Sequence, residues 1–235
     1  KNAENKSNLT PKYYNNIIRG KTKGWIDVYV LNMLGSIEEG KSVYPNWREE
    51  VHLSSEPLLP DVNSLLYVGI DFGLTPAATF GQRLSTGRWI ILHELVYFDM
   101  GAIRFAEALK HDFAKYFRNF ETEIYGDPSG DYRAQTDERT PFQMLRQAGI
   151  KAISAPSNDI ALRIEAVDSV LNKMADGKPC LLVDKRCLNL KKGFNGGYHY
   201  RRMQTAGDRY DEKPFKNRYS HIHDALQYMF MGAGE

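Results

Sequence analysis

Three aspartates stand at positions where their carboxylates could share metal ions. Asp71 lies inside the otherwise apolar run "YVGIDFGLTPAATFG", Asp127 ends the segment "EIYGD", and Asp224 lies within "SHIHDALQYMFM". Cleavage of a phosphodiester by two metal ions needs several carboxylates that converge on ions about 3.5–4 Å apart. Carboxylates suit this role because Mg²⁺ and Mn²⁺ are hard ions that prefer oxygen. An isolated Asp at the end of a strand is more often a turn residue, so the signal depends on a fold that brings the three together.

A histidine near the third aspartate could join the same site. His221 precedes Asp224 by three residues, so on a helix both side chains lie on one face. His223 is turned roughly 100° away from Asp224 by the 3.6-residue period. If the helix includes position 221, a neutral imidazole there can bind the metal or hold its water. The alternative is that His221 only caps the helix near Ser220.

Two patterns typical of nucleotide-binding proteins compete with the metal hypothesis. In the first, Asp71 with the Gly and Thr that follow it opens a phosphate loop, as in the actin and sugar-kinase fold. That fold also needs a second Asp-Gly loop, for which only "YGDPSGD" is a candidate, and a Gly-rich adenosine loop, for which nothing convincing is present. In the second, "GSIEEGKS" (35–42) matches the G-x-x-x-x-G-K-[ST] phosphate loop. Glu38 and Glu39 would face the anion, and Pro45 disfavours the helix that must follow. Both nucleotide interpretations are therefore disfavoured.

The apolar patterns predict the elements that must position these residues. Strands are expected over 65–72, 76–83 and 88–98, the last two joined by the turn "STGR". A helix capped by Asp99 should follow, with Phe105, Leu109, Phe113 and Phe117 on its apolar face. The strand "EIYGD", the helix "TPFQMLRQAGI" and the strand "KAISAPS" come next. This order predicts an α/β protein with a ribonuclease H-like mixed sheet flanked by helices.

Further helices are predicted at both ends of the chain. Residues 1–40 should be helical, with Thr10 as N-cap and Pro11 at the first helical position. A long helix carries an apolar stripe made of Ile160, Ile164, Val167, Leu171 and Met174. The strand "PCLLVD" follows it, then a turn and strand at "NGGYHYRR", and a terminal helix begins near "SHIHDALQYMFM".

Composition and charge narrow the class of protein. The 235 residues are 42% hydrophobic and 26% charged, and no apolar run approaches the roughly 18 residues of a membrane span. Cys180 and Cys187 are the only cysteines, too few for a zinc site, and a cytoplasmic setting is expected.

Net charge is only +2, but residues 185–218 hold ten Lys or Arg against three acids. Such a basic stripe is typical of a surface that follows phosphates. Its members Lys191, Lys192, Arg201 and Arg202 are the predicted nucleic-acid contacts; the alternative is a solvated loop.

Four blocks together resemble the nuclease domain of the large terminase subunit of tailed bacteriophages. They are "YVGIDFGLTPAATFGQ", "YGDPSGDYRAQTDERTPFQMLRQAGI", "FNGGYHYRR" and "HIHDALQYMFM". The resemblance covers residues 43–235, and residues 8–40 resemble the lid or linker that joins the packaging motor to the nuclease. It implies two domains, a helical linker over 1–42 and a ribonuclease H-like nuclease over 43–235.

The resemblance also implies a function. Asp71, Asp127 and Asp224 would bind two divalent ions, Mg²⁺ or Mn²⁺, with Asp71 bridging both and His221 assisting as a ligand or orienting group. The expected activity is endonucleolytic cleavage of concatemeric double-stranded DNA with little sequence preference, in the cytoplasm of the infected bacterial host. Expected partners are the small terminase subunit, the portal and an upstream ATPase domain of the same protein, with no membrane. A Holliday-junction resolvase or transposase core, an actin-fold ATPase and a docking module without metal remain as alternatives.

Overall fold

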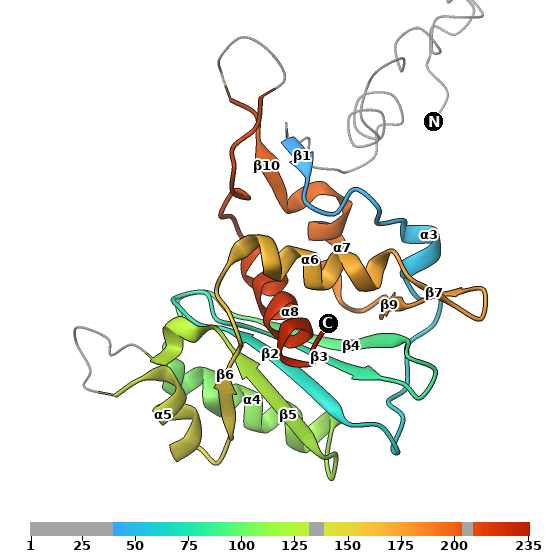
Figure 1. Cartoon of the computed structure of the whole chain (residues 1–235). Coiled ribbons are helices and arrows are strands. Elements are labelled where there is room, and N and C mark those ends of the chain that lie inside the picture. The colour runs from blue at the N-terminus through green and yellow to red at the C-terminus, as the bar shows by residue number, and fades with distance from the viewer. Residues whose placement is uncertain (1–39, 132–138, 204–208) are drawn as a thin grey trace, which may run out of the picture.

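A six-stranded mixed sheet forms the centre of the protein, in the order β6-β5-β2-β3-β4-β9 (Figure 1). The computed structural model describes residues 40–131, 139–203 and 209–235. The strands of this sheet are β2 (Leu66–Asp71), β3 (Ala77–Arg83), β4 (Trp89–Val96), β5 (Thr122–Gly126), β6 (Ala152–Ser154) and β9 (Leu181–Val183). β2, β3 and β4 form the predicted antiparallel meander, while β5 runs parallel to β2, β6 to β5 and β9 to β4. The predicted mixed sheet is confirmed.

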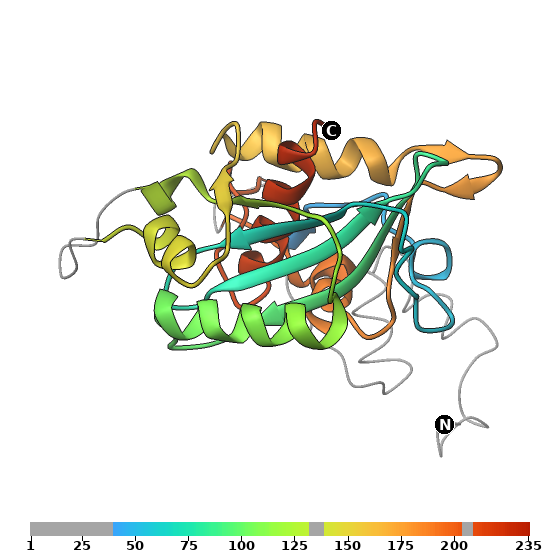
Figure 2. The ribbon, with the colours of Figure 1, turned by 90° about the horizontal axis from the view of Figure 1, so that it is seen from below.

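Helices cover both faces of this sheet. They are α3 (Glu49–His52), α4 (Ala102–Tyr116), α5 (Pro141–Gln147), α6 (Ile160–Leu171), α7 (Leu188–Lys192) and α8 (Ser220–Gly232), with the short turns η3 (Pro128–Asp131) and η4 (Gly193–Gly197). α4 and α5 lie on one face, and α6 and α8 lie on the other, as Figure 2 shows from below. Two small ribbons pair β1 (Gly40–Ser42) with β10 (His199–Arg201) and β7 (Met174–Ala175) with β8 (Lys178–Pro179). Among the described helices, none combines the length and apolarity needed to cross a bilayer.

The sheet separates two hydrophobic cores because side chains alternate along each strand. On the α4 side, Val68 and Ile70 of β2 pack with Phe105 and Leu109. On the α8 side, Trp89 and Ile91 of β4 pack against apolar residues of α6, α7 and α8. Alternation therefore places the odd-numbered residues of β2, including its last residue, beneath α8.

α8 lies unusually close to β2, and a glycine permits this. A Cβ on Gly69 would lie 1.9 Å from the carbonyl oxygen of Ala225 and 2.8 Å from Cβ of Met229. Only a residue without a side chain fits at that distance. The helix that carries His221 and Asp224 is therefore pressed onto the strand that ends at Asp71.

Three details differ from the sequence expectations. Asp99 is not the N-cap of the next helix: α4 begins after Gly101, and Asp99 instead adopts a left-handed backbone with φ of 51°. α6 ends at Leu171, so Met174 lies beyond it in β7 and is 61% exposed. Val167 and Leu171 are buried as predicted, and the buried face of α6 also includes Arg163, Ala166 and Val170.

Other expectations hold or lie outside the described residues. α5 begins with the capping box of Thr140 and Gln143, and α8 begins at Ser220 and so includes position 221. The predicted N-terminal helix with Thr10 as its cap falls in residues 1–39, outside the described part of the chain. The division into 1–42 and 43–235 stays a prediction; Gly40–Ser42 pair with β10.

Candidate metal centre

The candidate site lies where the central strand β2 meets the last helix. Asp71 is the final residue of β2, two residues after Gly69, so its side chain points to the α8 side of the sheet. His221 lies in the first turn of α8, and its Nδ1 is 2.9 Å from Oδ2 of Asp71. The strand and the helix thus bring the Asp71 carboxylate and the His221 imidazole into contact, although the two residues are 150 positions apart in the chain.

The environment of Asp71 makes its charge costly. The residue is only 5% exposed. Burial raises the pKa of its carboxyl to about 6; the hydrogen bond with His221 opposes this increase, and the negative charge of Asp224 adds to it. A carboxylate held near a second carboxylate in a buried place is typical of a cation site.

Asp224 is completely buried and is balanced by two basic side chains. Its Oδ1 lies 3.3 Å from Nη1 of Arg163, and its Oδ2 contacts Nζ of Lys216. Arg163 comes from α6, where its guanidinium lies 4.6 Å over the ring of Tyr228. Oδ1 of Asp224 finds no hydrogen-bond partner among the described residues. Burial without pairing would be very costly for this carboxylate, so the two cations are its counter-ions.

Asp127 lies on the strand beside Asp71. Ile70 pairs with Gly126 in the parallel register of β2 and β5, and the Asp127 N–H donates to the Ile70 carbonyl at 3.0 Å. If the same register is continued by one residue, Asp127 lies beside Asp71. Side chains at such paired positions of parallel strands point to the same face of the sheet. Its Oδ1 also accepts the N–H of Ser129 at 2.8 Å, which is the turn role that a lone Asp often has.

Tyr228 lies within electrostatic reach of all three carboxylates. Burial raises the pKa of its hydroxyl, Arg163 opposes the increase, and the negative charges of Asp127, Asp71 and Asp224 add to it. The hydroxyl donates to Oδ1 of Asn158 at 2.8 Å. The strand ends of β2 and β5 and the face of α8 therefore converge around this side chain.

The described residues do not yet form a closed metal cage. No three His, Cys, Asp or Glu side chains among them stand in an arrangement that could hold an ion as they are placed. The donor set nonetheless fits a hard cation, since it consists of carboxylate oxygens and one imidazole. Arg163 and Lys216 supply the positive charge at Asp224 in this arrangement.

Of the predicted phosphate-binding residues, Lys191 and Lys192 lie on α7, Arg201 is the last residue of β10, and Arg202 directly follows it. α7 and β10 lie on the same side of the sheet as α6 and α8 (Figure 1). Lys191 forms an ion pair of 2.8 Å with Glu49. Arg201 lies 3.4 Å from Oδ2 of Asp211 and stacks over the ring of Phe215. Lys192 and Arg202 are exposed. The stripe is thus partly neutralised within the protein itself.

Two residues of the site were missed from the sequence. Arg163 occupies a core-facing position of α6, three residues before Ala166 and four before Val167. That spacing could have predicted a buried ion pair, because an Arg on a buried helical face needs an anionic partner. Lys216 lies outside any regular element and approaches Asp224 through tertiary structure alone. No local pattern marks it.

The phosphate-loop pattern at 35–42 lacks the helix it requires. Gly40, Lys41 and Ser42 form β1, which pairs antiparallel with Arg201, Tyr200 and His199. A phosphate loop needs its Lys and Ser at the start of a helix, where N–H groups point at the anion. The structure therefore supports the rejection of this motif.

Comparison with known proteins finds relatives only among solved structures. No protein-family model and no curated protein matches the sequence. The large terminase of a thermophilic bacteriophage is 23% identical, with a TM-score of 0.63 over 96% of this chain and 53% of that one. The chain thus spans about half the length of that terminase.

Two isolated nuclease domains match over most of their own length. The nuclease domain of the P22 large terminase has a TM-score of 0.59 at 13% identity, covering 83% of this chain and 93% of that one. The large terminase nuclease of thermophilic phage G20c with bound cobalt has a TM-score of 0.52 at 13% identity, covering 81% and 96%. The chain has the ribonuclease H-like fold of phage large-terminase nuclease domains.

Proposed function

We propose that this chain is the nuclease part of a phage large terminase and cuts double-stranded DNA with the help of divalent cations. Asp71, Asp127 and Asp224 are the proposed ligands of two ions, Mg²⁺ or Mn²⁺, and His221 assists them. The observation that carries the proposal is the junction of β2 and α8, where Asp71, His221 and Asp224 converge in a buried place. The bound cobalt of the G20c nuclease supports a divalent cation in this fold.

The carboxylates have the properties that such a centre needs. Asp71 and Asp224 interact strongly enough for the charge of one to raise the pKa of the other. Both are anchored in packed elements, so they are held rigidly in place. Divalent cations, when bound, would activate water and offset the negative charge that develops on the phosphodiester.

His221 is proposed to position Asp71 and to take part in proton transfer. When its Nδ1–H donates to Oδ2 of Asp71, its Nε2 keeps a lone pair. That nitrogen can bind a cation or accept a proton from the attacking water. The helix supports this role because Ser220 starts α8, which leaves His221 on the face toward Asp71.

Duplex DNA would lie across α7 and β10. Lys192 and Arg202 are exposed there, and Lys191 and Arg201 are charged neighbours whose acidic partners could yield to phosphates. Phosphate contacts position a duplex without reading its sequence, in keeping with cutting of low specificity. Residues 1–42 are proposed as the linker to an upstream ATPase domain, and the small terminase subunit and the portal as partners in the host cytoplasm.

Plasmid nicking tests the proposal. Supercoiled DNA should be nicked and linearised with Mn²⁺ or Mg²⁺ but not with EDTA, and Asp71→Asn should reduce the rate by at least about 100-fold. Glu107→Gln is the matched control, since Glu107 lies on α4 on the opposite face of the sheet and should leave the rate unchanged. Nicking by Asp71→Asn at the wild-type rate would remove Asp71 from the centre.

The choice of substrate separates the proposal from its alternatives. Linear duplexes should be cut at least as fast as four-way junctions; the reverse order would favour a resolvase. ATP should not be hydrolysed, because Gly40–Ser42 form a strand and not the start of a helix. Turnover of ATP that disappears in Lys41→Ala would overturn that argument.

A further inference from the structure

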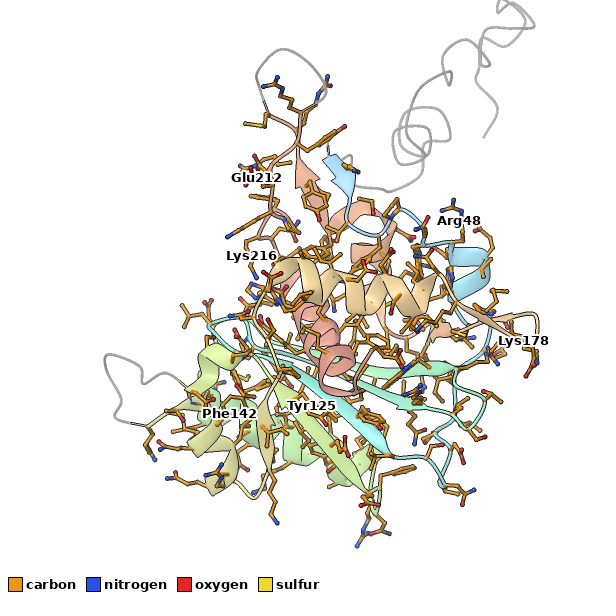
Figure 3. All side chains as sticks on the ribbon, viewed as in Figure 1. Arg48, Tyr125, Phe142, Lys178, Glu212 and Lys216 are labelled. Carbon is orange, nitrogen blue, oxygen red and sulfur yellow. The ribbon has the colours of Figure 1, made fainter. Side chains whose placement is uncertain are left out.

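Two cations face Asp224, and they differ sharply in how firmly they are held. Arg163 is 5% exposed and is fixed between Asp224 and the ring of Tyr228. The side chain of Lys216 is 65% exposed and reaches Asp224 from the irregular segment before α8, near the N-terminal end of α6 (Figure 3). A long exposed side chain leaves an ion pair easily, because water solvates its ammonium and it regains rotamer freedom. A buried guanidinium cannot do so without a large desolvation cost.

A cavity opens beside this pair. It has a volume of about 420 Å³, and its lining includes Arg163, Lys216, Lys213 and Asp159. Nε of Arg163 is buried there without a hydrogen-bond partner among the described residues. The N-terminus of α6 does not contribute, since the Asp159 carboxylate already accepts its N–H groups from Ala161 and Leu162. The positive charge of the cavity therefore comes from its side chains.

We propose that Lys216 is an exchangeable counter-ion of Asp224. In the metal-free protein its ammonium occupies the carboxylate oxygen that a divalent cation needs. When a cation takes that oxygen, Lys216 swings into the adjacent cavity and binds a backbone phosphate of the nucleic-acid strand, next to Arg163. The inference rests on the proposed role of Asp224 as a metal ligand.

This exchange couples two binding events. When Lys216 leaves Asp224, the protein loses one ion pair and gains one phosphate contact. Cation binding and strand binding therefore favour each other through Lys216. Without a cation, Lys216 is engaged and should add little to DNA binding. The ion pair with Lys216 also stabilises the folded protein before a cation binds. Asp224 is then paired with both Arg163 and Lys216, although Asp71 lies nearby.

Cation binding without DNA tests whether Lys216 competes with a cation for Asp224. Calorimetric titration with Mn²⁺ should show binding about fivefold or more tighter in Lys216→Met than in wild type, because the competing ammonium is gone. Lys213→Met is the matched control: Lys213 lines the same cavity, forms no described contact with Asp224, and its loss should change affinity less than about twofold. Equal or weaker Mn²⁺ binding by Lys216→Met would overturn the proposal.

An Asp224→Asn variant in the same titration separates this failure from failure of the proposed function. Loss of Mn²⁺ binding in Asp224→Asn, together with unchanged binding in Lys216→Met, would leave the metal centre standing and reject only the exchange. If Asp224→Asn binds Mn²⁺ as wild type does, the proposed centre itself fails.

DNA binding tests whether the released Lys216 contacts a phosphate. With Ca²⁺ as the cation, Lys216→Met should bind a short duplex several-fold more weakly than wild type, whereas in EDTA the two should bind equally. Lys216→Arg keeps the charge and should stay within about twofold of wild type in both conditions. A loss of the same size with and without Ca²⁺ would mean that Lys216 is an ordinary phosphate contact and not an exchangeable one.

Discussion

Nη1 of Arg163 lies 3.3 Å from Oδ1 of Asp224, and both side chains are buried between α6 and α8. The pair joins the two helices that cover the site, so the candidate centre is also part of the core. A change at Asp224 should therefore affect folding as well as chemistry, which distinguishes it from the half-buried Asp127.

Asp224→Asn should lower stability because it leaves Arg163 buried without its anion. Removing one partner of a buried pair costs about 3 kcal/mol. Urea unfolding in EDTA should show this loss for Asp224→Asn and less than about 1 kcal/mol for Asp127→Asn, whose residue is only half-buried. Equal stability of the two variants would mean that the Arg163 pair does not support the core.

Stability should depend on pH through Asp71. Burial raises the pKa of its carboxyl to about 6, against the ordinary 3.8 of the unfolded chain, so between these values the folded protein binds more protons. Stability from this position is therefore present below about pH 4 and falls as the pH rises through about 6. Two pKa units correspond to at most about 3 kcal/mol.

The measurement is a comparison of wild type with Asp71→Asn in EDTA. From about pH 4.5 to about pH 7, the unfolding free energy of the variant should gain about 2 kcal/mol relative to wild type, since the amide does not ionise. A difference that stays constant over this range would show that the Asp71 carboxyl does not titrate there.

The two histidines of α8 should behave differently. His221 is partly exposed and bonded to Asp71, so His221→Ala should reduce nicking by about 100-fold and leave the melting temperature nearly unchanged. His223 is completely buried, stacked on Tyr198 at 5.0 Å and edge-on to Phe194 at 4.6 Å. His223→Ala should cost about 2–3 kcal/mol of stability. Similar effects of the two substitutions on nicking, measured at low temperature, would remove His221 from the site.

Salt dependence should reveal the phosphate contacts. Lys192→Ala should lower the slope of log affinity for duplex DNA against log salt by about 1, as expected for one lost phosphate contact. Lys191→Ala should change the slope less, because Lys191 is already paired with Glu49. Unchanged slopes in both variants, and in Arg201→Ala and Arg202→Ala, would make the stripe a solvated surface only.

The local patterns were sufficient to predict the sheet. Strand-length apolar runs separated by turn residues predicted β2, β3 and β4, and the segment that begins at Thr140 was correctly predicted to be the helix α5. Local patterns gave wrong element boundaries where tertiary packing determines the end of a helix. Met174 continued the helical spacing of α6, but the chain turns into the β7–β8 ribbon after Leu171.

The candidate site was only partly readable from the sequence. Asp71 and Asp224 could be found because an acid inside an apolar segment is unusual. Their counter-ions could not be assigned, since Lys216 and Arg163 reach Asp224 through the packing of separate segments. The close approach of α8 to Gly69 likewise depends on three-dimensional packing.

Anomalous diffraction from crystals soaked in Mn²⁺ would show whether cations bind at the junction of β2 and α8. We expect peaks within about 2.0–2.6 Å of carboxylate oxygens of Asp71 and Asp224, one of them also within reach of Asp127. Lys216 should have moved away from Asp224 in the same map. Crystals that show no peak at this junction, with Asp224 still held by Arg163 and Lys216, would mean that these aspartates do not form a metal centre.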